Sequence, residues 1–305
     1  MARIGLFLIT TIAIISTISI VLTLIGFTGV YEQNGIDLDY NSLMILCLVW
    51  GMVGSFVALY MSKWIAKRMG IHIIKQPSNE FEKWYVSIVE KHSKILGIKT
   101  PEIGILKSDA PNAFATGALR NSSLVVLSTG LVKKMNRNEV EAVIGHEMSH
   151  VSNGDMVTLA LIQGIVNSFV FFFAFVVAHF ISRVIFRDSR GGGFWIQFFI
   201  RQFLIVFFSI LASPIIFWFS RRREFRADFG GAQLAGKQNM ILALEALQKH
   251  SAAKLPDQMV AFGISNRGQK NTWRKLFSTH PPLGKRIEAL RDAEIVALPE
   301  QHQST

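Results

Sequence analysis

The stretch EAVIGHEMSHVSNGDMVTLALIQGIVNSFV, residues 141–170, decides the fold of this chain. Its first half has the apolar spacing of an amphipathic helix and contains the HExxH pattern His146-Glu147-Met148-Ser149-His150. Its second half begins an apolar run that continues to Ile181, long enough to cross a bilayer core of about 30 Å. A helix with potential metal ligands therefore leads almost directly into a predicted membrane segment.

The composition also indicates a membrane protein. Of the 305 residues, 50% are hydrophobic and 17% are charged, and the mean hydropathy is +0.35, which is too apolar for an ordinary soluble protein. The net charge is nevertheless +11, a combination that excludes a disordered chain and favours a membrane protein with Lys and Arg held on one side. A nucleic-acid binder would share the charge but not the apolarity, so we expect no nucleic-acid partner. The single cysteine, Cys47, excludes a disulfide framework.

Four apolar runs predict two transmembrane hairpins, at residues 4–27, 43–61, 157–181 and 194–219. The first connector is acidic, whereas Lys63, Lys67 and Arg68 follow the first hairpin, so the positive-inside rule places the polar parts in the cytoplasm. The link of the second hairpin carries Arg183, Arg187 and Arg190, which conflicts with that rule. The depth of the second hairpin therefore stays open.

The HExxH pattern predicts a zinc site. On a helix, positions i and i+4 are about 40° apart and about 6 Å along the axis, so His146 and His150 project toward one ion. Glu147 lies about 100° away from His146, where it can reach a water molecule on the metal rather than ligate. The alternative, two histidines on a solvated helix, conflicts with the apolar face of Val140 and Ile144, because a packed helix gives its histidines partners.

A third ligand is expected just after the second hairpin, because a catalytic zinc usually has three protein ligands. Glu224 and Asp228 have i, i+4 spacing there. Glu224 can complete the ligand set, and Asp228, one turn later, can accept the free N–H of a ligating histidine. The alternative is a solvated charge pair beside the arginines at 221–223.

The two polar stretches flank an even number of crossings and can build one domain. Within them we expect strands at 102–106 and 123–128, and helices at 77–96, 136–151, 237–250 and 284–293. The predicted fold is an α-helical membrane protein whose cytoplasmic α+β catalytic domain is split by a transmembrane hairpin. Its expected parts are a first hairpin (1–62), a catalytic part with the HExxH helix (63–156), a second hairpin (157–219) and a catalytic part with the third ligand (220–305).

The chain resembles the HtpX-type membrane zinc metallopeptidases, relatives of the CAAX-processing protease of eukaryotic membranes, over nearly its whole length. The stretches that support the resemblance are HExxH at 146–150, ExxxD at 224–228, PNAFATG at 111–117 and STHPP at 278–282. It implies a zincin-like domain with one zinc ion, in an endopeptidase of the inner membrane whose active site faces the cytoplasm. The implied substrates are membrane proteins, often damaged ones, in stress response and protein quality control.

The expected mechanism uses zinc held by His146, His150 and Glu224, with Glu147 as the base that takes a proton from the attacking water. The carbonyl oxygen of the substrate then needs a donor, which His280 or Arg286 could supply. A structural contact is the alternative role for each.

Substrate binding is expected at residues 112–116, where Asn112, Ala113 and Phe114 would form part of an edge strand that holds an extended peptide through main-chain hydrogen bonds. Broad specificity should follow, because this mode reads the backbone more than the side chains.

A rival interpretation is a membrane transporter or scaffold with an incidental HExxH helix. Its functional groups would be the polar residues at membrane depth, which are Gln163, Asn167, His179 and Arg201. Packing within the hairpin is the alternative role for these four residues.

Overall fold

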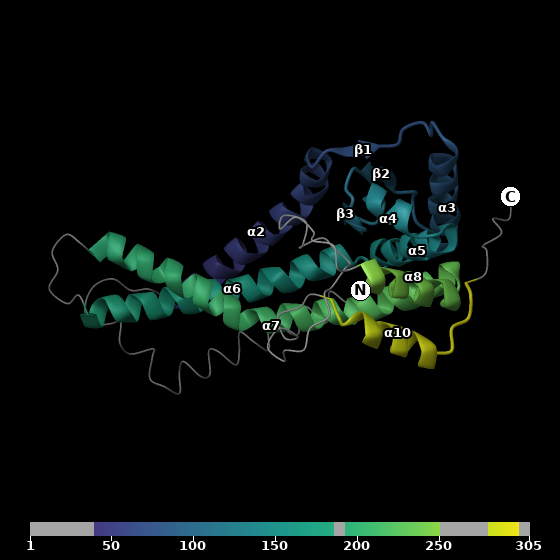
Figure 1. The fold of residues 1–305 in the computed structure, drawn as a ribbon. Coiled ribbons are helices and arrows are strands. Elements are labelled where there is room, and N and C mark those ends of the chain that lie inside the picture. The colour runs from purple at the N-terminus through teal and green to yellow at the C-terminus, as the bar shows by residue number, and fades with distance from the viewer. Residues whose placement is uncertain (1–39, 186–192, 251–279, 299–305) are drawn as a thin grey trace. The chain divides into compact units, whose positions relative to one another are not determined.

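The computed structural model describes residues 40–185, 193–250 and 280–298 (Figure 1). Several expected features lie outside the described residues: the apolar run at 4–27, its acidic connector, Arg187 and Arg190 of the second link, and residues 278–279 of the STHPP stretch.

The chain divides into two compact units. One unit extends to Phe56 and includes residues 160–212, and the other includes residues 57–159 and the chain from Ser213 onward. We call them the membrane unit and the polar unit.

Among the described residues, three helices are long and apolar enough to cross a membrane: α2 (Tyr40–Arg68), α6 (Asp155–Ile185) and α7 (Gly193–Ala235). They contain the apolar runs predicted at 43–61, 157–181 and 194–219. Helix α7 extends 16 residues beyond the predicted end of its run, from 219 to 235. The arginines at 221–223 end the apolar character without ending the helix, because arginine is a good helix former.

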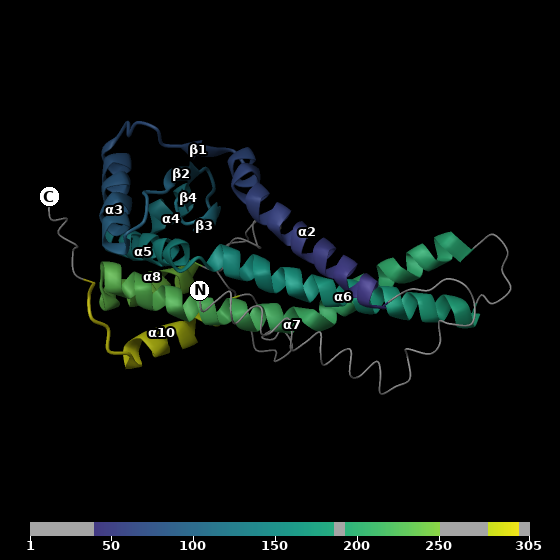
Figure 2. The same cartoon turned by 180° about the vertical axis from the view of Figure 1, so that it is seen from behind.

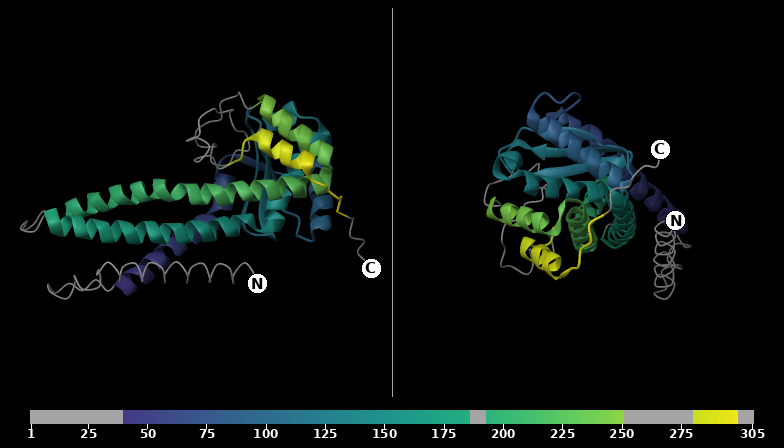
Figure 3. Two further views of the ribbon diagram at one scale, coloured as in Figure 1. Left: turned by 90° about the horizontal axis from the view of Figure 1, so that it is seen from below. Right: turned by 90° about the vertical axis from the view of Figure 1, so that its right-hand side faces the viewer.

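In the membrane unit, α2 and α6 approach closely where both have small residues. A Cβ atom on Gly51 would lie 2.6 Å from the carbonyl oxygen of Gly164. The hydroxyl of Ser168, one turn after Gly164, donates to that same carbonyl at 2.7 Å. Small residues let the backbones of membrane helices touch, which gives dispersion contacts over a long stretch. Farther along, α6 and α7 lie side by side, with Ala174 and Ala178 against Leu204 (Figure 3).

The polar unit contains a four-stranded mixed sheet. Its strands are β1 (Ile71–Ile73), β2 (Glu102–Leu106), β3 (Ala113–Leu119) and β4 (Ser122–Ser128), in the order β1-β2-β4-β3. The strands predicted at 102–106 and 123–128 are β2 and β4, which pair in parallel. Strand β3 is antiparallel to β4 and lies at the end of the described sheet, as expected for the edge strand predicted at 112–116.

The remaining helices of this unit are α3 (Glu80–Leu96), α4 (Thr129–Lys134), α5 (Arg137–Asn153), α8 (Lys237–His250) and α10 (Leu283–Asp292). Four of them match the predicted helices, and the short α4 was not predicted. Helix α5 lies between the sheet with α3 on one side and α8 on the other, and α10 packs on α8 (Figures 2 and 3). The predicted combination of membrane helices with a small α+β part is confirmed.

Helix α5 has strong boundaries. A capping box starts it: Asn136 accepts from the backbone N–H of Glu139, whose carboxylate accepts from the N–H of Asn136. Gly154 ends it with φ 66°, a left-handed conformation that glycine adopts without steric cost. Ile144 and Met148 are buried in the apolar core of the unit, together with Tyr85 and Leu244. The HExxH residues therefore occupy a fixed, central helix.

Candidate metal centre

The HExxH helix touches α7 through glycines. A Cβ atom on Gly231 of α7 would lie 2.9 Å from the backbone nitrogen of His146, and one on Gly145 of α5 would lie 3.2 Å from Cα of Gly231. A Cβ atom on Gly230 would overlap the side chain of Ser149. Because these positions have no side chain, the two backbones come together at the HExxH turn. Glu224 and Asp228, which precede the glycines on α7, are thereby brought alongside the histidines.

The three predicted ligands converge. One donor atom from each of His146, His150 and Glu224 lies within 4.8 Å of the other two, and all three residues are buried. Nε2 of His146 is 3.7 Å from Oε2 of Glu224, and Nε2 of His150 is 3.4 Å from Oε1 of the same carboxylate. Among the described residues this is the group that could hold a metal ion.

The donor set fits zinc. Zinc–nitrogen and zinc–oxygen bonds of about 2.0–2.1 Å in a tetrahedron place neighbouring donors about 3.3 Å apart. The separations of 3.4 and 3.7 Å are close to that value. Oε2 of Glu224 is buried and has no hydrogen bond within the described residues, although cationic groups lie near it. A buried carboxylate oxygen surrounded by cationic groups is a site that favours a positive charge, as a metal ligand does.

Asp228 and Arg286 hold His146. Nδ1 of His146 lies 3.0 Å from Oδ1 of Asp228. The guanidinium of Arg286 donates to both oxygens of Asp228, from Nε at 2.7 Å and from Nη2 at 2.5 Å. With Nδ1 of His146 bound to the carboxylate, Nε2 is left as the donor to a metal.

His150 has an equivalent arrangement that sequence reasoning missed. Its Nδ1 lies 2.7 Å from Oδ2 of Asp155, the first residue of α6. Oδ1 of Asp155 accepts from Nη2 of Arg226 at 2.5 Å. The Asn-Gly-Asp sequence at 153–155 is the local signal for this contact. A glycine that ends a helix turns the chain back toward the last turn of that helix, which here contains His150.

Charge–charge interactions dominate this buried site. Burial lowers the pKa of His150, but its contacts with Asp155 and Glu224 outweigh burial and raise the pKa to about 10. Burial likewise disfavours the charge of Arg286, but Asp228 and Glu224 outweigh it and raise the pKa of the guanidinium. A proton and a metal ion compete for the same nitrogen of His150, so metal binding there displaces the proton.

The two expected donors to the carbonyl oxygen also lie at Glu224. Nδ1 of His280 is 2.8 Å from Oε2 of Glu224, and Nη1 of Arg286 is 3.2 Å from the same oxygen, an ion pair without hydrogen-bond geometry. Arg286 is completely buried, whereas the His280 side chain is 19% exposed. Arg286 is also bound to Asp228, and His280 is the more accessible of the two.

The expected substrate strand begins beside β4. The main chain of Asn112 is bonded to Ser128 in both directions: its N–H donates to Oγ, and its carbonyl accepts from the N–H of Ser128, both at 2.8 Å. Its side-chain amide is buried without a hydrogen-bond partner in the described parts of the chain. Ala113 and Phe114 follow in β3 and are buried.

Three of the four polar residues of the rival interpretation contact neighbours in the membrane unit. Gln163 donates to Asn167 at 2.9 Å, along one face of α6. The guanidinium of Arg201 lies over the ring of Phe175 at 4.6 Å. Both arrangements agree with packing inside the hairpin.

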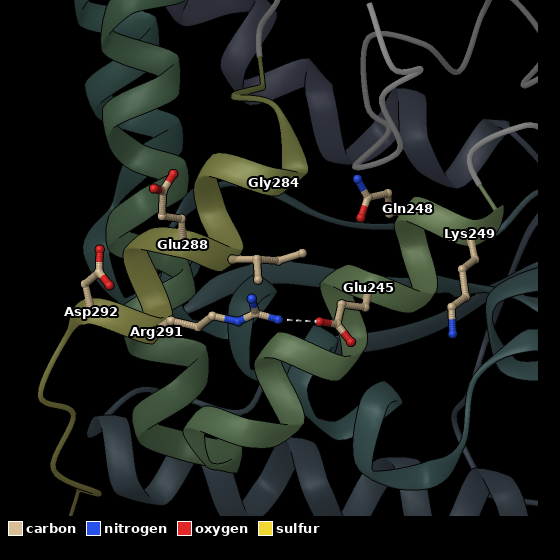
Figure 4. Close-up of a pocket in the computed structure, with 8 residues that line it drawn as sticks. Glu245, Gln248, Lys249, Gly284, Glu288, Arg291 and Asp292 are labelled. Atoms are coloured by element: carbon tan, nitrogen blue, oxygen red, sulfur yellow. Dashed lines mark hydrogen bonds and ion pairs between the residues drawn. The ribbon is translucent and has the colours of Figure 1, made fainter.

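A cleft lies elsewhere in the polar unit, between α8 and α10 (Figure 4). Its volume is about 560 Å³, and its walls carry charged side chains such as the exposed Arg291 and the partly exposed Glu245, which form an ion pair at 3.0 Å. None of the predicted ligands or catalytic residues lines this cleft.

Comparison with known proteins identifies the family of the chain. The profile of peptidase family M48 matches residues 80–294. Protease HtpX of Thioalkalivibrio sulfidiphilus is 52% identical over 95% of this chain and 99% of its own length. Protease HtpX of Nitrosococcus oceani is 49% identical over 95% of this chain and 98% of its own length. The chain therefore belongs to peptidase family M48.

A solved structure has the same fold. The crystal structure of S. mikatae Ste24p matches 94% of this chain and 67% of its own, with a TM-score of 0.60 and 19% sequence identity. Together with the full-length relatives, the apolar helices and the His-His-Glu cluster, this identifies a membrane metalloprotease and confirms the resemblance found in the sequence.

Proposed function

We propose that this chain is a zinc-dependent endopeptidase that cleaves membrane proteins, including misfolded or damaged ones, in protein quality control. One observation supports the site most strongly: His146, His150 and Glu224 converge while Nδ1 of each histidine lies against a separate carboxylate. Such an arrangement fixes both rings with Nε2 toward one point, as in histidine sites for zinc.

In this proposal His146, His150 and Glu224 hold one zinc ion. Bound zinc lowers the pKa of a water molecule and polarises the carbonyl of the scissile bond. The carboxylate of Glu147, next to the first ligand on α5, takes the proton of the attacking water and returns it to the leaving amine. Glu147 is buried in the same helix turn as the ligands, so its position is fixed by the packing of α5.

The neighbouring groups have separate roles. The partly exposed His280 donates to the oxygen on which negative charge develops, and Asp228 orients His146. An extended substrate pairs with the edge of β3 that faces away from β4, which begins next to Asn112 and includes Ala113 and Phe114.

We further propose that residues 63–156 and 220–305 form one catalytic domain on the cytoplasmic side of the inner membrane. The division into units supports the first part, because residues 57–159 and the chain from Ser213 belong together. Lys63, Lys67 and Arg68 support the orientation, since they lie at the end of α2 where the apolar run stops.

The decisive experiment uses the full chain purified in detergent with a model membrane protein as substrate. Glu147→Gln should keep about one zinc ion per chain and lose cleavage by at least about 100-fold, because the general base is gone while the ligands remain. The exposed Glu90→Gln on α3 is the matched control and should match the parent. Normal turnover by Glu147→Gln would refute the mechanism, and a parent chain that binds no zinc would refute the zinc site.

A further inference from the structure

Asp155 is fully occupied by partners from two other helices. It is completely buried at the start of α6. Oδ2 faces Nδ1 of His150, Oδ1 accepts from Arg226, and its backbone carbonyl accepts from Nη1 of Arg223 at 3.1 Å. A carboxylate bound at both oxygens cannot rotate, so it offers the imidazole one fixed acceptor.

The same pattern recurs at the other histidine. His146 is held by Asp228 and Arg286, and His150 by Asp155 and Arg226. The two arginines differ in exposure: the Arg286 side chain is completely buried, whereas that of Arg226 is 45% exposed. A change at Arg226 can therefore be accommodated by solvent, and its effect on the metal site can be separated from loss of the fold.

We propose that Asp155 and Arg226 are positioning residues that hold Nε2 of His150 toward the metal ion. This inference rests on the proposed zinc site. The carboxylate accepts the proton of Nδ1, which fixes the tautomer with a free lone pair on Nε2 and makes that nitrogen a stronger donor. Arg226 acts through Asp155 by holding its second oxygen, so its contribution is smaller than that of Asp155.

The test measures zinc affinity of the full chain in detergent by competition with a chromophoric chelator, alongside cleavage. Loss of such a partner typically weakens metal binding about 10–100-fold. We expect Asp155→Ala to show a loss in this range, and Arg226→Ala a smaller loss that Arg226→Lys largely restores. The matched controls are Asp292→Asn, exposed at the end of α10, and Arg222→Ala, which removes an arginine of α7 outside the site.

A saturating-zinc arm separates positioning from a purely structural role. At saturating zinc, Arg226→Ala should regain most of its kcat with KM unchanged, whereas a misfolded fraction would not respond to zinc. If Asp155→Ala does not fold, Asp155→Asn and Arg226→Ala decide the question. Zinc affinity within twofold of the parent in the folded variants overturns the inference. A parent chain that neither binds zinc nor cleaves overturns the proposed function instead.

Discussion

Arg286 and Asp228 form a completely buried, two-point ion pair. The guanidinium donates to both carboxylate oxygens, and it also lies 3.2 Å from Oε2 of Glu224. Breaking a buried pair by removing one partner leaves a charge without compensation, which typically costs about 3–5 kcal/mol. We expect Arg286→Met to lower the free energy of unfolding by about that amount, measured by thermal unfolding in detergent.

The control for this change is Arg291→Met on the same helix. Arg291 pairs with Glu245 at 3.0 Å, but its side chain is 62% exposed, and such surface pairs contribute about 0–1 kcal/mol (Figure 4). Equal losses in the two variants would contradict the assignment of Arg286 as a buried structural partner of the site.

The parts of the site that the sequence predicts are those set by local geometry. His146 and His150 are one helical turn apart, as are Glu224 and Asp228, so the period of the helix places each pair on one face. Asp155 could not be placed in this way, because its partner Arg226 is 71 positions away and its approach to His150 depends on the turn at Gly154.

The fold shows the same division between local and long-range information. The apolar runs and the amphipathic pattern of α5 are local, and they predicted the helices well. Strand β1 was missed because it has three residues and gains its identity only by pairing with β2. The length of α7 was missed because hydropathy ends at the arginines whereas helicity continues to Ala235.

Glu224 is expected to be required for metal binding rather than for folding alone. Its two oxygens face Nε2 of both histidines, so Glu224→Ala removes one of three ligands. Zinc content of the purified chain should fall well below one per chain, measured by elemental analysis after dialysis. Glu288→Ala, exposed on α10, serves as the control. Unchanged zinc stoichiometry in Glu224→Ala would direct the search to another carboxylate.

Gly231 is expected to set the distance between the two ligand helices. A Cβ atom there would lie 2.9 Å from the backbone nitrogen of His146, so Gly231→Ala must push α7 away from α5. We expect a loss of about 1–3 kcal/mol in unfolding free energy, together with weaker zinc binding. Gly284→Ala on α10 has no atom within 4 Å of its new Cβ and should leave both quantities near the parent values. Parent-like zinc affinity in Gly231→Ala would show that the ligands tolerate the displacement.

Gly51 is expected to set the distance between the membrane helices α2 and α6. Its added Cβ would lie 2.6 Å from the carbonyl oxygen of Gly164 and 2.7 Å from the backbone nitrogen of Ser168. These are backbone atoms, so the helices must separate, and Gly51→Ala should lower thermal stability in detergent by about 1–3 kcal/mol. Gly54, one turn away on α2, has no atom within 4 Å of a new Cβ. Gly54→Ala should therefore be neutral or slightly stabilising, because alanine is the better helix former. If both variants unfolded at the same temperature, the close approach of α2 and α6 at Gly51 would not contribute to stability.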